Sequence, residues 1–293
     1  MKKLRFHSKF DKSWQVKKAE TFLMSTLFLL FLIAYLPVWK RLVEAWSSND
    51  EYSHGFLIIP VCMYILLRER RQIAQCQTAP SNWGVVILAT GLFTYIFSYL
   101  AEILTLASLS MLIVLTGLTI CVYGFDAFKK ARFVLFLMLF MIPVPAQIYS
   151  SATLPLQLMV SKASTWLIDV AGIPVYREGN MIRLATKSLE VVQACSGLRS
   201  MISLFALSSI FGYFIIKSNA SRGLLILLGV PISISVNIVR IFLIAVFSYY
   251  FSYDLTNESI HGLFGIAIFG FAIVLIFGSG RILSLWEKSN ETG

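Results

Sequence analysis

The chain has 293 residues, of which 57% are hydrophobic and 14% are charged, and its mean hydropathy is +0.76. Soluble domains carry about 25% charged residues, so this composition excludes a soluble globular domain and indicates a membrane protein. The net charge of +10 does not indicate nucleic-acid binding, because no basic residues alternate with aromatic residues in a polar module. The four cysteines lack C-x-x-C and metal-ligand spacing, so we expect no disulfide framework, no metal and no other cofactor.

Long apolar runs predict an all-α polytopic protein with eight membrane-spanning helices, since about 20 apolar residues cross a bilayer. The first run follows a basic tail, 1–20, and has no small-residue cleavage site, which favours a span over a cleaved signal. We expect one integral-membrane domain, 21–280, and a short tail, 281–293. The expected spans are 21–39, 55–68, 84–101, 103–124, 131–149, 199–216, 223–250 and 260–280.

The distribution of Lys and Arg residues sets the expected orientation, because short basic loops stay on the cytoplasmic side of a membrane. If the N-terminus is cytoplasmic, the cytoplasmic segments hold 17 of the 25 Lys and Arg residues, and the opposite side holds seven. This bias predicts that both termini lie in the cytoplasm, which requires an even number of spans.

One long segment, at about 150–198, then lies on the outer side of the membrane. Its first part, TLPLQLMVSKASTWLIDVAG, has apolar residues at helical spacing with a polar face, which predicts a helix at the interface or among the spans. The rest, IPVYREGNMIRLATKSLEVVQ, alternates polar and apolar residues around an EGN turn, which predicts a short β-hairpin before the sixth span.

Arg240 lies inside the seventh expected span, about ten residues before its outer end, or roughly 15 Å along the helix. Charged residues at membrane depth are rare and usually functional. Asn237 lies three residues earlier on the same helix face, which favours a polar pocket. The alternative is a structural arginine that snorkels to the surface or forms an ion pair.

His261 opens the last expected span, at its outer end. Histidine is the usual general base near neutral pH, although a single interfacial histidine is more often only part of a polar surface. Gly262 and Gly265 follow it and allow another helix or a substrate to approach closely.

Cys195 immediately precedes the sixth expected span, where Ser196 is a candidate N-cap. A helix N-terminus favours the thiolate form of a cysteine, and Arg199 adds a positive charge nearby. These conditions turn a thiol into a nucleophile. The alternative is a buried structural cysteine, which is the more common role of this residue type.

Cys195, Arg240 and His261 therefore lie towards the outer ends of three consecutive expected spans. A thiolate nucleophile, a cation that stabilises an oxyanion and a base suit acyl transfer from a peptide carbonyl. Glu258, three residues before His261, is a candidate to orient the base, although a solvent-exposed loop acid is the more usual reading. His54, in NDEYSHGF, is a rival base because it is expected at the same face.

The motifs ACSGLRS, NIVRI and HGLFG resemble those of the exosortase/archaeosortase family, and EYSHGFLIIP, MIPVPAQI and GIPVYREGNMIRL are similar to bacterial exosortases. The resemblance runs from about Asp50 to about Gly278, with several motifs in the family's order. It implies a multi-pass cysteine transpeptidase or protease of the bacterial inner membrane, with its active site facing the periplasm. The family's Cys, Arg and His correspond to Cys195, Arg240 and His261.

The resemblance also implies the partners. Family members recognise exported proteins that end in a Pro-Glu-Pro-like motif (PEP-CTERM), a transmembrane helix and a basic cluster. They cleave near the motif and transfer the acyl group to an acceptor, whose nature the sequence leaves open. Bacterial members often accompany exopolysaccharide production. We expect the single-domain form, without the extra C-terminal domain of some exosortases.

Two other function classes remain open from the residues alone. In a transporter, Arg240 would bind an anionic substrate and Cys195 would be passive. Against this, no inverted repeat is visible, and the polar residues gather at one face rather than at the midplane. The other class is a non-catalytic assembly component of an envelope or exopolysaccharide system.

Overall fold

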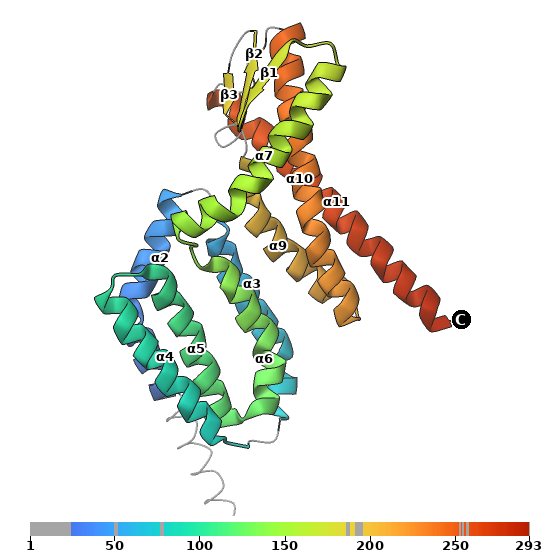
Figure 1. Ribbon diagram of the computed structural model, residues 1–293. Helices are drawn as coiled ribbons and strands as arrows, with labels where there is room; N and C mark the ends of the chain where they lie inside the picture. The colour runs from blue at the N-terminus through green and yellow to red at the C-terminus, as the bar shows by residue number, and fades with distance from the viewer. Residues whose placement is uncertain are drawn as a thin grey trace, which may run out of the picture.

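The computed structural model describes residues 25–49, 52–76, 79–185, 188–190, 196–251, 253, 255 and 258–292. Within these ranges the chain is helical apart from one small sheet, which confirms the expected all-α membrane class (Figure 1). The helices are α2 (Leu36–Ser48), α3 (Gly55–Ala74), α4 (Asn82–Leu100), α5 (Leu104–Tyr123), α6 (Phe125–Met138), α7 (Ala146–Val170), α9 (Ser196–Ile215), α10 (Asn219–Tyr250) and α11 (Glu258–Thr292).

Four described helices are long and apolar enough to cross a membrane: α4, α5, α10 and the part of α11 at Gly262–Asn290. A fifth span results if the helix Ser25–Ala34 and α2 act together, with a bend of 58° between them. The count of eight therefore stays a prediction. Among the other helices, α3 carries four consecutive charged residues, at 68–71, and α6 has only 14 residues.

The expected span 131–149 is interrupted. Helix α6 ends at Met138, a single 3-10 turn (Leu139–Met141) follows, and α7 begins at Ala146. Pro143 and Pro145 lie between them, and proline lacks the N–H that a continuing helix needs and restricts the residue before it. Helix α7 is consequently 25 residues long and begins before the outer segment was expected to start.

Helices α2 to α6 form one bundle, which surrounds a core of buried apolar residues (Figure 1). Small residues bring α4 and α5 into close contact: a Cβ placed at Gly117 would lie 2.6 Å from the backbone nitrogen of Leu88, and one at Gly91 would lie 2.7 Å from Val114. Close backbone approach is a common way for membrane helices to associate, because lipid provides no hydrophobic driving force.

Helices α9, α10 and α11 form a second bundle, and α7 crosses between the two (Figure 1). Helix α10 has 32 residues and α11 has 35, so both extend beyond a typical hydrocarbon thickness of about 30 Å. Buried residues of α9, α10 and α11 form their own core at one end of this bundle. At the other end, α7 and α10 pack against the sheet.

The sheet is a three-stranded antiparallel meander of β1 (Val175–Glu178), β2 (Met181–Leu184) and β3 (Ser188–Glu190). The expected hairpin is confirmed, and β3 extends it. The turn between β1 and β2 has two residues, with Gly179 at a φ of 62°, a conformation that glycine adopts without strain. Ile182 and Leu189 face α7 and α10 and are buried.

Candidate functional site

Arg240 is buried inside the second bundle, with only 2% of its surface exposed. Its guanidinium carbon lies 6.0 Å from the ring centroid of Phe264 on α11, which is within the range of a cation–π contact. One residue further, Gly265 faces the same guanidinium, since a Cβ there would lie 3.8 Å from Nη2. A small residue on α11 thus leaves room beside the charged group.

The turns of α10 that follow Arg240 pack against the sheet. Ile241, Ile244 and Ala245 are fully buried in the core that includes the sheet. The helix then continues to Tyr250, whose hydroxyl donates to the backbone oxygen of Ala171 at 3.0 Å. The arginine therefore does not snorkel to the surface, and its charge lies inside the protein.

Asn237 occupies the same face of α10, one turn from Arg240, and is 1% exposed. Neither its amide nitrogen nor its amide oxygen has a hydrogen-bond partner among the described residues. Leaving a buried polar group unsatisfied costs about 1–3 kcal/mol, so such a group in a folded protein calls for an explanation.

A buried polar stripe on α10 consists of Ser233, Asn237 and Arg240, at positions i, i+4 and i+7. Ser235, which the sequence also places in this helix, is exposed instead. The stripe is buried inside the protein, as expected for polar residues in a membrane protein, and its Arg240 approaches α11.

His261 and Glu258 lie in the first turn of α11, and their side chains are outside the described part of the structure. Position 261 precedes Phe264 and Gly265 by three and four residues, so it shares the helix face that approaches Arg240. The backbone thus brings position 261 within about one helical turn of the arginine contact.

Cys195 lies outside the described residues. Helix α9 begins at the next residue, Ser196, and the Arg199 side chain is also not described. Helix α9 packs against both α10 and α11. The candidate nucleophile therefore directly precedes a helix that packs against α10, while the location of the thiol itself stays a prediction.

His54, the rival base, connects three elements. It is the N-cap residue of α3, its Nε2 lies 2.8 Å from the backbone oxygen of Phe140, and its Nδ1 lies 3.1 Å from Oγ of Ser203 on α9. A carbonyl oxygen only accepts, so Nε2 carries the proton and Nδ1 accepts from the serine hydroxyl. This geometry gives His54 a role in joining α3 to α9, and the sequence provided no signal for Ser203.

Among the described residues, no group of three His, Cys, Asp or Glu side chains is arranged to hold a metal ion. Cys62, Cys76 and Cys121 are free thiols, and Cys62 is buried in the first bundle.

This fold and site define a class: a helical membrane protein with an arginine and an asparagine buried in the helical bundle that carries a small sheet. Residues 46–278 of the 293 match the model of one family, described as transmembrane exosortase. The chain belongs to the transmembrane exosortase family, which confirms the resemblance of its motifs. No curated protein and no solved structure matches the chain.

Proposed function

We propose that this protein is a cysteine peptidase or transpeptidase that processes C-terminal sorting signals at the outer face of the bacterial inner membrane. One observation carries the proposal. Arg240 and Asn237 are both buried on one face of α10, the amide of Asn237 has no described partner, and Arg240 lies beside α11. Family membership supports sorting-signal processing as the reaction class.

In the first half of the reaction, the Cys195 thiolate attacks the carbonyl carbon of the scissile peptide bond. Negative charge develops on the carbonyl oxygen, and Arg240 stabilises it, with the amide N–H of Asn237 as a second donor. The intermediate collapses as the C–N bond breaks, and His261 donates a proton to the leaving amine. A thioester on Cys195 results.

In the second half, an acceptor nucleophile attacks the thioester carbonyl. His261 removes the acceptor's proton, the same oxyanion site stabilises the second intermediate, and the thiolate of Cys195 leaves. An amine acceptor gives transpeptidation, and water gives hydrolysis. Glu258 holds the orientation of His261 in this scheme, while Arg199 and the N-terminus of α9 favour the thiolate.

The excess of Lys and Arg in the expected cytoplasmic segments supports an orientation with both termini in the cytoplasm. The substrate's transmembrane helix would then lie beside this protein in the bilayer, with its cleavage motif at the outer face and its basic cluster on the cytoplasmic side. Helix α11 presents exposed apolar residues along its length, such as Leu263, Ile266 and Val274, which suit contact with lipid or with a substrate helix.

The test is co-expression with an exported protein from the same genome that carries such a tail, followed by the substrate's size on gels. We expect Cys195→Ala, Cys195→Ser, Arg240→Ala and His261→Ala each to abolish processing while the protein still accumulates in the membrane. Undiminished processing by Cys195→Ala would exclude the mechanism. Full activity in His261→Ala with loss in His54→Ala would transfer the role of the base to His54.

Arg240 and Asn237 would also suit an anion inside a transporter, since both are buried and one amide is unsatisfied. The Cys195→Ala variant distinguishes the two functions. A transporter retains its activity in Cys195→Ala and loses it in Arg240→Ala, whereas the peptidase loses activity in both variants.

A further inference from the structure

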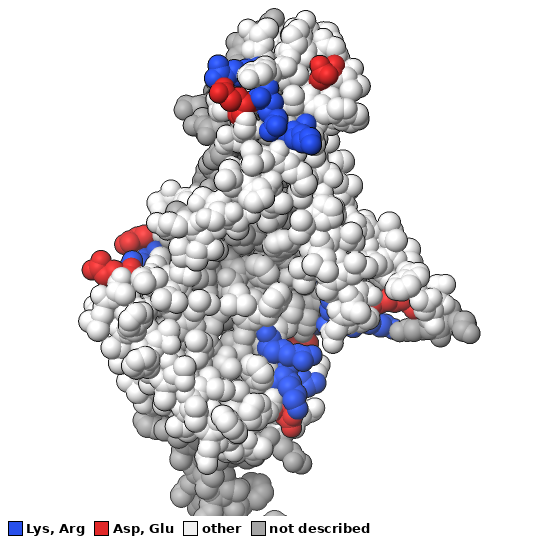
Figure 2. Space-filling view, in the orientation of Figure 1, with Lys and Arg blue, Asp and Glu red and all other residues white. Residues whose placement is uncertain are grey.

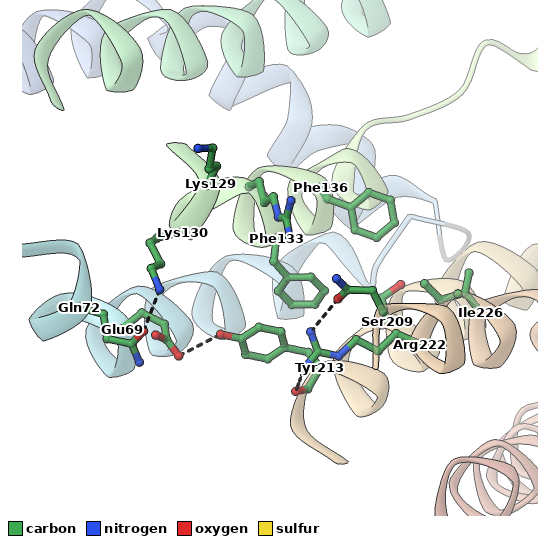
Figure 3. Close-up of a pocket in the computed structure, with 13 residues that line it drawn as sticks. Glu69, Gln72, Lys129, Lys130, Phe133, Phe136, Ser209, Tyr213, Arg222 and Ile226 are labelled. Atoms are coloured by element: carbon green, nitrogen blue, oxygen red, sulfur yellow. Dashed lines mark hydrogen bonds between the residues drawn. The ribbon is translucent and has the colours of Figure 1, made fainter. Parts of the chain in front are cut away.

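A cavity of about 910 Å³ opens between α3, α6, α9 and α10, at the end of the molecule remote from the sheet (Figures 1 and 3). It is separate from the polar stripe, because its α10 residues belong to the first turns of that helix, Asn219 to Ile226. The basic run Lys129, Lys130 and Arg132 is visible in the sequence, but there it indicates only a cytoplasmic segment and not a cavity.

The charge of the lining is positive. Lys129, Lys130, Arg132 and Arg222 line the cavity, against one carboxylate, Glu69. Glu69 already accepts a hydrogen bond from the hydroxyl of Tyr213 at 3.0 Å, and Lys129 pairs with Asp126 at 2.9 Å. No described carboxylate lies within 4.0 Å of the other three cations. The cavity therefore favours an anion with several oxygen acceptors.

Apolar and aromatic side chains form a large part of the remaining wall, as Figure 3 shows, beside the polar Gln72, Ser209 and Asn219. The rings of Phe133 and Tyr213 stack with centroids 4.2 Å apart, and the guanidinium of Arg222 lies 5.4 Å above the tyrosine ring. Phe136 and Ile226 continue this surface along α6 and α10. A charged rim beside an apolar wall matches an amphiphile rather than a small soluble ion.

The cavity also lies at the membrane depth that lipid headgroups occupy. Helix α10 is a described span that begins at Asn219, so its first turns lie where hydrocarbon gives way to water. Figure 2 shows a cluster of Lys and Arg side chains at this level, separated from those on the sheet by uncharged surface. Basic pockets between transmembrane helices at this boundary bind anionic headgroups.

We propose that this cavity binds an anionic phospholipid. Its phosphate lies among Lys130, Arg132 and Arg222, and an acyl chain runs along Phe136 and Ile226. The basic cluster of a sorting signal is excluded by charge repulsion. The proposal goes beyond the processing reaction and does not depend on Cys195.

The test uses the purified full-length protein in nanodiscs of phosphatidylcholine alone or with added phosphatidylglycerol, and counts retained lipids by native mass spectrometry. Wild type is expected to retain phosphatidylglycerol in preference to phosphatidylcholine. Lys130→Gln/Arg132→Gln is expected to lower that preference roughly tenfold or more, because each basic group at a membrane surface contributes on the order of 1 kcal/mol. Both residues are exposed, so the fold should tolerate the change.

The matched control is Lys40→Gln/Lys162→Gln, which removes the same charge from exposed positions outside the cavity and is expected to leave the preference unchanged. Equal losses in the two double variants would overturn the proposal. Inorganic phosphate at millimolar concentration should not displace the lipid. Complete displacement of the lipid would indicate that the cavity binds a soluble phosphate compound, and would overturn the proposal of a lipid site.

A second measurement does not depend on charge. A photo-crosslinking residue at Ile226, which lines the cavity, is compared with one at Leu227, its 67% exposed neighbour. In mixed nanodiscs, position 226 should yield adducts enriched in phosphatidylglycerol, and position 227 should yield adducts in the ratio of the bulk lipid. The same ratio at both positions would contradict a specific site.

Discussion

The two helical bundles differ in their buried polar groups, although each contains at least one without a described partner, the indole N–H of Trp39 in the first and the amide of Asn237 in the second. In the first bundle, the hydroxyl of Tyr35 is hydrogen-bonded to Oγ of Ser110 at 3.1 Å, and the indole N–H of Trp46 donates to the backbone oxygen of Met141 at 2.9 Å. In the second bundle, the amide of Asn237 has no described partner and adjoins the buried Arg240. The satisfied groups join helices, whereas the amide of Asn237 is distinguished by its position one turn from a buried charge.

Under the proposed function, the first bundle supports the fold and the second bundle holds the reactive groups. The first bundle is joined by close contacts at glycines and by internal hydrogen bonds. The second bundle keeps a polar stripe beneath the sheet at a cost in stability. Function and stability should therefore respond to mutation in opposite ways in the two bundles.

The largest effect is expected at Arg240. Arg240→Met keeps the approximate volume and removes the charge, so processing should fall by about 1,000-fold or more through loss of oxyanion stabilisation. The change also removes the cation–π contact with Phe264, which is worth about 1 kcal/mol, so the midpoint of thermal unfolding should fall only slightly. Rates of substrate processing and thermal unfolding in detergent check both parts. A large fall in the midpoint would instead assign Arg240 a structural role.

The second prediction concerns stability of the first bundle. Gly117→Ala places a Cβ 2.6 Å from the backbone nitrogen of Leu88, so α4 and α5 must separate, at a cost of roughly 1–3 kcal/mol. The midpoint of thermal unfolding should fall by several degrees. Gly270→Ala on α11 is the control, because no atom lies within 4 Å of its added Cβ. Equal midpoints in the two variants would refute the close packing.

A smaller effect on activity is expected at Asn237. Asn237→Leu removes the unsatisfied amide from a 1% exposed position, so processing should fall by about 100-fold while thermal stability is kept or increased. The contrasting change in the first bundle is Ser110→Ala, which breaks the bond to Tyr35 and should lower stability by about 1 kcal/mol with normal processing per folded molecule. If both variants lose only stability, the two bundles do not differ in the proposed way.

The smallest effect is expected at the junction of the bundles. Ser203→Ala removes the hydroxyl that donates to His54 Nδ1 and should lower the free energy of unfolding by about 1 kcal/mol. Ser279→Ala removes a hydroxyl bonded only within its own helix and should cost less. Denaturant unfolding compares the two. Processing per folded molecule should remain close to wild type in both variants, and a specific loss in Ser203→Ala would implicate the His54 pair in catalysis.

Much of the fold was predictable because hydrophobic periodicity is a local property. The helices at 82–100 and 104–123 and the hairpin around Gly179 lie close to where the sequence placed them. The interruption before α7 was not predicted, although Pro143 and Pro145 are its cause, because the apolar run continues through them. The lengths of α10 and α11 were underestimated, since each helix continues beyond its apolar part.

The candidate site was predictable in part. An arginine inside an apolar run and an asparagine one turn away are visible in the sequence, and both prove to be buried on one face. Phe264 as the ring beside Arg240, Ser203 as the partner of His54 and the cavity formed by four separate helices were not visible. Each depends on contacts between residues far apart in the chain.

The sequence by itself determined the membrane class, the exosortase family and the candidates for reactive residues, because composition, helical period and motif order are local properties of the chain. Only the tertiary structure decided which of these residues are buried together and which polar groups lack partners. Burial and hydrogen-bond satisfaction depend on how separate helices meet. For that reason the sequence shows Asn237 only as a neighbour of Arg240, whereas the structure makes it a candidate hydrogen-bond partner of the substrate.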